Sequence, residues 1–240
     1  MSVIAIIPAR YQSSRFPGKP LVMIKGKSMV QRVWEKASLS KSIAKVIVAT
    51  DDERIFNHVK SFGGEVMMTS PKHRNGTERI AEVMRKQSQK FDYVLNIQGD
   101  EPFVKWQQIE MLCKIIEREE FQIASLAKQI DITKELDSPN VVKVVMSKQQ
   151  KALYFSRYAI PFNRSGDAQI AYYKHIGMYA FEASALQKLI ALEMTPLEQA
   201  ESLEQLRWLE AGFSIGMGIS EFDSVGIDTP EDLEHALTYL

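Results

Sequence analysis

The chain of 240 residues is long enough for one large α/β domain, which needs neither disulfides nor a structural metal to fold. Its 30 basic residues balance 30 acidic ones, which argues against a protein that coats nucleic acid by bulk charge. No run approaches the ~20 apolar residues that span a bilayer, and the single cysteine, Cys113, excludes an internal disulfide. We therefore expect a soluble cytoplasmic protein that binds neither nucleic acid nor membranes.

Short β-branched runs alternate with longer amphipathic segments over roughly the first 120 residues. Such runs predict strands, and apolar residues at helical spacing predict helices between them. In chain order, the expected elements are a strand at Val3–Ile7, a helix at Ser28–Ala37, a strand at Lys45–Ala49, a helix at Asp52–Phe62, a strand at Glu65–Met68, a helix at Thr77–Gln87, a strand at Tyr93–Ile97 and a helix at Trp106–Glu117. This alternation is typical of a mostly parallel sheet flanked by helices, with ligands at the carboxyl ends of its strands.

The rhythm changes after about residue 120, where strand-like pieces follow one another without long helices between them. These pieces are Ile123–Lys128, Val141–Met146, Ala152–Ser156 and Tyr172–Tyr179. We expect a mixed, partly antiparallel region, about 120–180, that extends the sheet and supplies a dimer surface. Two helices should follow, one from Thr195 to about Ala211 and one from Thr229, each with Thr as N-cap and Pro next. No linker divides the chain, so we expect a single domain over 1–240.

The first expected strand opens into a loop that carries three cations, Arg10, Arg15 and Lys19, within ten residues. A buried strand that leads into a basic loop presents backbone N–H groups and positive charge to phosphates. The loop contains neither the G-x-x-x-x-G-K-[ST] motif nor the G-x-G-x-x-G motif. A solvated basic loop is the alternative, but the Gly18-Lys19 pair after a buried strand favours an anion site.

Two aspartates are candidate metal ligands. Asp100 follows the strand at Tyr93–Ile97, where a carboxylate faces the ligand crevice and suits Mg²⁺, although Gly-Asp is also ordinary turn chemistry. Asp228 lies one residue before the last helix and is either a second metal ligand or a carboxylate that favours the helix dipole. A third acidic segment, Asp51-Asp52-Glu53, resembles the D-x-D signature of glycosyltransferases, but we favour Asp52 as a helix N-cap.

Ten segments together resemble the 3-deoxy-manno-octulosonate cytidylyltransferases, the CMP-Kdo synthetases. They occur in the family's order over nearly the whole chain. They are Ile7–Leu21, Ala49–Asp52, His73–Arg79, Asn96–Pro102, Lys143–Val145, Ala152–Arg157, Ile160-Pro161, His175–Tyr179, Leu203–Arg207 and Asp228–Leu233. The resemblance implies a nucleotide-diphospho-sugar transferase-like, Rossmann-like fold, with a mostly parallel sheet flanked by helices and a mixed or antiparallel extension for dimerisation.

The same resemblance implies a nucleotidyltransferase. The family joins CTP to the anomeric hydroxyl of the acid sugar Kdo and releases pyrophosphate, giving CMP-Kdo for lipopolysaccharide biosynthesis. CTP and Kdo are thus the expected substrates, Mg²⁺ the expected cofactor and a homodimer the expected assembly. Activation of 8-amino-Kdo or of a sialic acid type of sugar stays open. A glycosyltransferase would leave the basic loop unexplained, and a non-catalytic nucleotide-binding regulator would not need both Asp100 and Asp228.

The resemblance also implies residue roles. The expected catalytic residues are Asp100, Asp228 and Lys19, and the two aspartates are the expected metal ligands. The expected nucleotide-binding residues are Ala9, Arg10, Arg15, Lys19, Gly76, Arg79 and Gln98. The expected sugar-binding residues are Arg157, His175, Glu204 and Gln205, with Arg157 as the partner of the sugar carboxylate. One position departs from the family pattern, since Asn75 stands where a serine is usual, and its contacts to base or ribose stay open.

Overall fold

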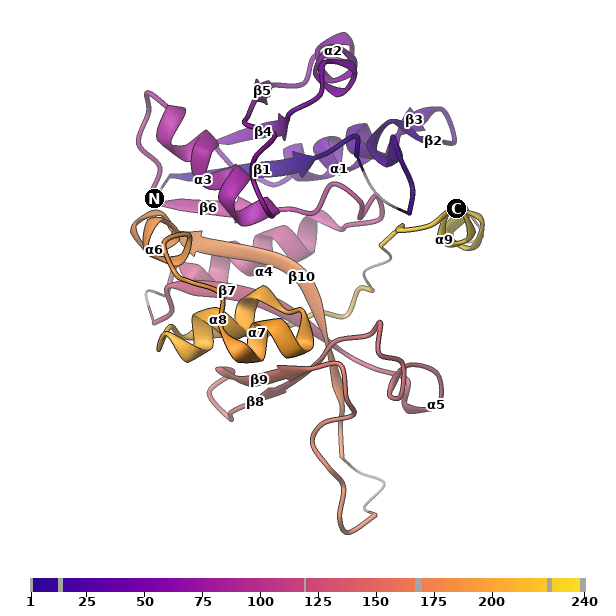
Figure 1. The fold of residues 1–240 in the computed structure, drawn as a ribbon, viewed down its shortest axis with the longest axis vertical. Helices are drawn as coiled ribbons and strands as arrows, with labels where there is room; N and C mark the ends of the chain where they lie inside the picture. The colour runs from indigo at the N-terminus through magenta and orange to yellow at the C-terminus, as the bar shows by residue number, and fades with distance from the viewer. Residues whose placement is uncertain (1, 13–14, 119, 167–169, 224–225, 238–240) are drawn as a thin grey trace.

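The computed structural model describes residues 2–12, 15–118, 120–166, 170–223 and 226–237 (Figure 1). One nine-stranded sheet organises these residues, in the order β11-β7-β10-β6-β1-β4-β5, with β8 and β9 attached beside β10. Its strands are β1 (Val3–Ala9), β4 (Lys45–Thr50), β5 (Val66–Met68), β6 (Tyr93–Asn96), β7 (Ile123–Gln129), β8 (Lys143–Met146), β9 (Ala152–Ser156), β10 (Tyr173–Glu182) and β11 (Ile215–Ile219). A small hairpin, β2 (Met23–Ile24) and β3 (Lys27–Ser28), stands apart from this sheet.

Helices cover both faces of the sheet (Figure 1). They are α1 (Met29–Ser38), α2 (Glu53–Ser61), α3 (Gly76–Lys86), α4 (Trp106–Ile116), α5 (Ile132–Glu135), α6 (Ala183–Leu189), α7 (Pro196–Glu201), α8 (Glu204–Glu210), α9 (Pro230–Leu237) and the 3₁₀ turn η1 (Lys19–Leu21). None of the helices in the described ranges has the length and apolar character needed to cross a membrane.

Strand β1 lies at the centre of the parallel half of the sheet, between β4 and β6. Its residues Val3–Ile7 are all fully buried, as expected for a parallel strand covered on both faces. Because side chains alternate along a strand, Val3, Ala5 and Ile7 pack with α1, α2 and α4, whereas Ile4 and Ile6 pack with α3, α6 and α8. The expected parallel sheet flanked by helices is therefore confirmed.

The second half of the sheet is mixed, as expected, but it is joined to the first half in an unexpected place. Strand β10 runs antiparallel to both β6 and β7, with Tyr179 opposite Asn96 on one side and Ser125 on the other. A strand late in the sequence is therefore inserted beside β6, and this arrangement places β10 next to the carboxyl ends of the parallel strands.

Strand β11 was not predicted. It pairs in parallel with β7, and two of its five residues, Gly216 and Gly218, are glycines, which weaken a strand pattern. Packing explains Gly218, because a Cβ atom there would lie 2.7 Å from Ile115 Cδ1 of α4. The glycines that hide the strand in the sequence let the helix pack closely against it.

The prediction of one continuous helix from Thr195 to about Ala211 is wrong in detail. The segment is divided into α7 and α8, because Ser202 takes a left-handed conformation with a φ of 52° between them. The Thr195 side chain makes no capping hydrogen bond. At the last helix the expected cap is confirmed, since Thr229 Oγ1 accepts from the Asp232 N–H at 3.1 Å and Asp232 Oδ2 accepts from the Thr229 N–H at 2.9 Å.

Candidate functional site

A cavity of about 400 Å³ lies at the carboxyl ends of β1 and β6. All seven residues expected to hold a nucleotide line it, together with both aspartates expected to bind a metal. Its lining residues are Pro8, Ala9, Arg10, Gln12, Arg15, Lys19, Pro20, Asn75, Gly76, Arg79, Gln98, Gly99, Asp100 and Asp228. The structure thus gathers segments that are more than 200 residues apart in the sequence around one basic and acidic cavity.

Lys19 is the central charge of this cavity. Its Nζ donates to Asp100 Oδ2 at 2.7 Å and to Asp228 Oδ1 at 2.9 Å, while Arg15 donates to Asp228 Oδ2 at 2.8 Å. Burial alone would lower the pKa of Lys19, but the two carboxylates outweigh burial and raise it. Burial likewise opposes the charge on Asp228, yet Lys19 and Arg15 hold the pKa of this carboxyl below its usual value. Lys19 and Asp228 are therefore both charged at neutral pH.

The C-terminal arm brings Asp228 to this cavity. The Ile227 N–H donates to the Asp100 carbonyl oxygen at 3.0 Å, and the buried Ile227 side chain packs in a small cluster with Ile24 and Met29. Asp232 Oδ2 accepts from the Asp228 N–H as well as capping α9. The arm is thus attached on both sides of Asp228, and Figure 1 shows α9 beside the β2–β3 hairpin.

Close backbone packing holds Asp100 beside the basic loop. A Cβ atom on Gly99 would lie 2.7 Å from the Pro8 carbonyl oxygen, and one on Gly76 would lie 3.2 Å from the Pro8 ring. The turns after β6 and before α3 therefore pack directly on the end of β1. Only glycine allows the approach at position 99 without displacing backbone.

Sequence reasoning missed the support of the basic loop by Tyr11 and Arg54. The Gly18 N–H donates to the Tyr11 carbonyl oxygen at 2.8 Å, and Gly18 has a φ of 73°, so the loop closes tightly. The Arg54 guanidinium lies 3.2 Å above the centre of the Tyr11 ring and bonds to Asp52 through two nitrogens. A cation over an aromatic ring is attractive, but no sequence spacing links residues 11 and 54.

The D-x-D interpretation finds no support in the geometry. Asp52 Oδ1 accepts from the Arg54 N–H at 2.9 Å as the N-cap of α2, which confirms the favoured alternative. Asp51 accepts from Arg79 Nη2 at 2.9 Å. Arg79 lines the cavity, but it is only 1% exposed, and its guanidinium also donates to Thr69, so it ties α3 to the ends of β4 and β5.

The residues expected to bind the sugar are spread around α7, α8 and the β8–β9–β10 part of the sheet. Arg157 lies at the end of β9, and its guanidinium donates to the carbonyl oxygens of Pro139 and Glu201. Glu204 begins α8 and bonds to the first turn of α3, while Gln205 is buried beside it. The structure therefore does not gather these residues into the 400 Å³ cavity as it gathers the nucleotide set.

His175, on β10, lies beside the aromatic rings of Phe155 on β9 and Tyr179 on β10. Its Nε2 lies 2.8 Å from Ser125 Oγ, and its ring centre lies 5.1 Å from that of Phe155 and 5.3 Å from that of Tyr179. Burial lowers the pKa of His175 to about 3. The imidazole is therefore neutral at physiological pH and is a hydrogen-bonding group rather than a cation.

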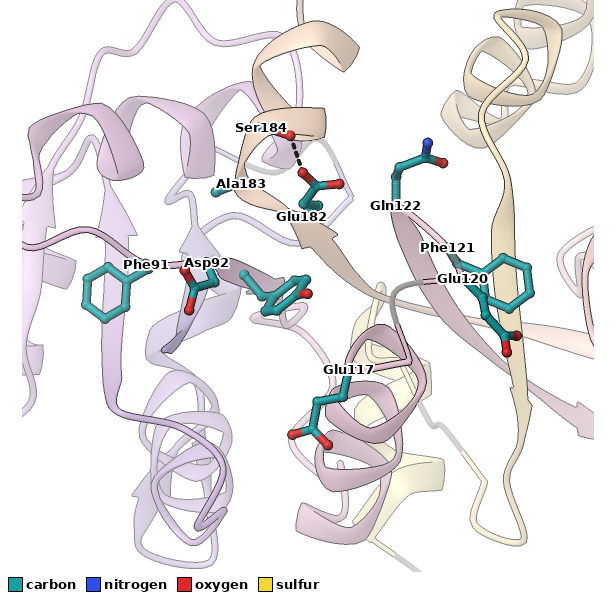
Figure 2. Close-up of a pocket in the computed structure, with 10 residues that line it drawn as sticks. Phe91, Asp92, Glu117, Glu120, Phe121, Gln122, Glu182, Ala183 and Ser184 are labelled. Carbon is teal, nitrogen blue, oxygen red and sulfur yellow. Dashed lines mark hydrogen bonds between the residues drawn. The ribbon is translucent and has the colours of Figure 1, made fainter. Parts of the chain in front are cut away.

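A larger cavity of about 880 Å³ lies at the opposite edge of the sheet, where β6 and β7 begin. Figure 2 shows Asp92, Glu117, Glu120 and Glu182 around it. Four carboxylates repel an anionic ligand, so this cavity does not suit a nucleoside triphosphate, and the smaller basic cavity does.

We predict that His175 does not titrate in the physiological range. Because the folded protein holds the ring neutral while an unfolded histidine protonates near pH 6.5, its stabilising contribution is complete above pH 6.5 and is lost as the pH falls towards 3. NMR of the histidine ring signals, with His175→Gln for assignment, should show a constant His175 signal between roughly pH 8 and pH 5. A midpoint near the ordinary value would contradict the burial of this ring.

Comparisons with known proteins show the family of this chain. The family model for cytidylyltransferases matches residues 4–218. The 3-deoxy-manno-octulosonate cytidylyltransferase of Thermodesulfovibrio yellowstonii is 49% identical, over 98% of this chain and 97% of the relative. The 8-amino-3,8-dideoxy-manno-octulosonate cytidylyltransferase of Shewanella sp. (strain ANA-3) is 48% identical, over 97% of this chain and 96% of the relative.

A solved structure gives the same result. The structure of CMP:2-keto-3-deoxy-manno-octonic acid synthetase complexed with CTP superposes on this one with a TM-score of 0.94. The two sequences are 41% identical, and the match covers 100% of this chain and 98% of the other. The sequence relatives and this structure cover nearly the full length of both chains. The chain therefore belongs to the 3-deoxy-manno-octulosonate cytidylyltransferase family.

Proposed function

We propose that this nucleotidyltransferase transfers the cytidylyl group of CTP to the anomeric hydroxyl of Kdo and releases pyrophosphate, a step in lipopolysaccharide biosynthesis. The observation that carries the proposal is the single cavity in which Arg10, Arg15 and Lys19 lie with Asp100 and Asp228. Full-length relatives with this activity in their names support the choice of substrates. Activation of 8-amino-Kdo is the second candidate, because relatives named for that sugar are 48% identical.

The basic loop would hold the triphosphate. Arginine offers paired N–H donors to phosphate oxygens. Lys19 offers a point charge, because its raised pKa keeps the ammonium protonated. The close turns at Gly76 and Gly99, with the backbone of Ala9, leave room for cytidine beside β1. Gln98 Nε2 donates to the Gly177 carbonyl oxygen at 3.0 Å, which orients this amide at the cavity wall.

The reaction needs in-line attack of the sugar oxygen on the α-phosphorus. A bond forms between that oxygen and phosphorus, the bond to pyrophosphate breaks, and the hydroxyl proton passes to solvent water. Arg15 and Lys19 would stabilise the charge that develops on the leaving pyrophosphate. We assign His175 no part in moving the proton, because its pKa of about 3 makes it a poor proton acceptor.

Asp100 and Asp228 fit the requirements of a magnesium site. Both carboxylates lie within 3 Å of the same Nζ atom, so they face one point in the cavity. Mg²⁺ is commonly bound by one or two carboxylates together with substrate phosphates, and no group of three or more metal-binding side chains is found among the described residues. When bound, Mg²⁺ would neutralise phosphate charge and polarise the attacking hydroxyl.

The acid sugar would bind on the β10 and α8 side of the cavity. Arg157 is the proposed partner of its carboxylate, since hydrogen bonds to neutral carbonyl groups orient the guanidinium without cancelling its charge. Neutral His175, Glu204 and Gln205 would bind its hydroxyls. Burial and the nearby Glu198 raise the pKa of Glu204, whereas Thr77 and Arg207 oppose this shift.

We further propose that the protein is a cytoplasmic homodimer. Leu153, Tyr158 and Phe162 are 58%, 83% and 86% exposed, and Figure 1 shows the segment after β9 extending away from the sheet. Apolar side chains gathered on an extended segment are typical of a covered interface. A second copy of the chain is the occupant that we propose.

Pyrophosphate release with CTP and a panel of acid sugars tests the activity. We expect release with Kdo, and a comparison with 8-amino-Kdo and sialic acid identifies the preferred sugar. Asp100→Asn should lower turnover by about 100-fold or more, because a charged group at the reacting phosphate is lost. Asp131→Asn is the control, since Asp131 caps the distant helix α5 and asparagine caps as well. Near-normal turnover by Asp100→Asn would contradict the metal assignment.

Sedimentation velocity tests the assembly. We expect a dimer for the unaltered protein and a monomer for Phe162→Asp, because a buried unpaired charge opposes association. Met194→Asp changes a side chain that is 51% exposed elsewhere on the surface, and it should remain dimeric. A monomeric unaltered protein would exclude the proposed dimer.

A further inference from the structure

The two polar atoms of the Asn75 side chain bond to two different helices. Its Oδ1 accepts from the Glu78 N–H at 2.9 Å and caps α3, and its Nδ2 donates to Glu204 Oε1 at 2.9 Å. The same residue lines the 400 Å³ cavity next to Gly76. Asn75 therefore connects the wall of the proposed nucleotide cavity with α8, which lies 129 residues away in the sequence.

The Glu204 carboxylate is held by donors from two elements. Thr77 Oγ1 donates to Oε2 at 2.9 Å from the first turn of α3, and Arg207 Nη2 donates to Oε1 at 2.7 Å from α8 itself. Asn75 and Arg207 thus share one oxygen. Thr77 holds Oε2 from α3, and Asn75 holds Oε1 from the N-cap of the same helix, so the bond from Asn75 is the one that ties Oε1 to α3.

We propose that Asn75, at the wall of the nucleotide cavity, is a positioning residue that orients Glu204 for acid-sugar binding. The inference rests on the proposed function and deepens it, because it assigns a role to a side chain for which the sequence left the contacts open. By fixing Oε1 of Glu204 against the cavity wall, Asn75 sets the geometry of a proposed sugar contact from the nucleotide side.

The side-chain chemistry explains why asparagine suits this position. Serine, aspartate and asparagine cap helices about equally well, so capping does not require an amide. Serine carries a single, shorter hydroxyl, which cannot occupy the positions of both Oδ1 and Nδ2. Aspartate keeps the cap but would place a carboxylate against Glu204, where like charges repel.

Steady-state kinetics of Asn75→Ser and Asn75→Asp test the proposal. Loss of a hydrogen bond to a charged group should raise the KM for Kdo by about 10-fold in Asn75→Ser, and by more in Asn75→Asp. The KM for CTP should stay within about 2-fold, and both variants keep the cap of α3, so a fall in unfolding temperature reports the lost contact with Glu204. An unchanged KM for Kdo, or an equal rise in both KM values, would overturn the proposal.

A double-mutant cycle with Glu204→Ala identifies the route of the effect. In that background Asn75→Ser should cause no further rise in the KM for Kdo, and an undiminished rise would show that Asn75 does not act through Glu204. Urea unfolding of the unaltered protein, the two single variants and the double variant gives their free energies of unfolding. These values measure the coupling between residues 75 and 204 without substrate. If the unfolding free energies show coupling between residues 75 and 204 but the unaltered protein releases no pyrophosphate, the Asn75–Glu204 contact stands. The proposed function then fails.

Discussion

The site depends on one interaction, the contact of the Lys19 ammonium with the carboxylates of Asp100 and Asp228. It joins three segments of the chain: the loop after β1, the turn after β6 and the C-terminal arm. Two carboxylates close together repel each other, and a buried lysine alone favours its neutral form. Each group therefore makes the charge on the others tolerable, and the cavity keeps both signs of charge side by side.

Much of the site follows from the parallel half of the sheet, which explains why the sequence predicted it. Arg10 and Asp100 follow the buried strands at Val3–Ile7 and Tyr93–Ile97, and parallel strands bring their carboxyl ends to the same edge. Asp228 was also expected as a second metal ligand paired with Asp100, although no sequence pattern shows that the two residues meet. The contact itself depends on the Ile227 anchor, which no periodicity reveals.

The parts that the sequence did not predict have physical causes as well. Strand β11 is hidden because two of its five residues are glycines, and Gly218 lies close to the side chains of α4. The break at Ser202 is hidden because serine rarely takes a left-handed conformation, so the pattern from Thr195 to Ala211 looks like one helix. The support of the basic loop by Arg54 and Tyr11 is a tertiary contact with no sequence signature. In each case, long-range packing outweighs the local preference.

We propose that the cavity around Lys19 binds CTP together with a metal ion held by Asp100 and Asp228. A crystal structure of the protein with CTP and Mg²⁺ tests it most directly. We predict phosphate oxygens in contact with Arg15 and Lys19, cytidine beside Gly76, and a cation contacted by both aspartates. CTP bound elsewhere on the molecule, or a cation that touches neither carboxylate, would contradict the account.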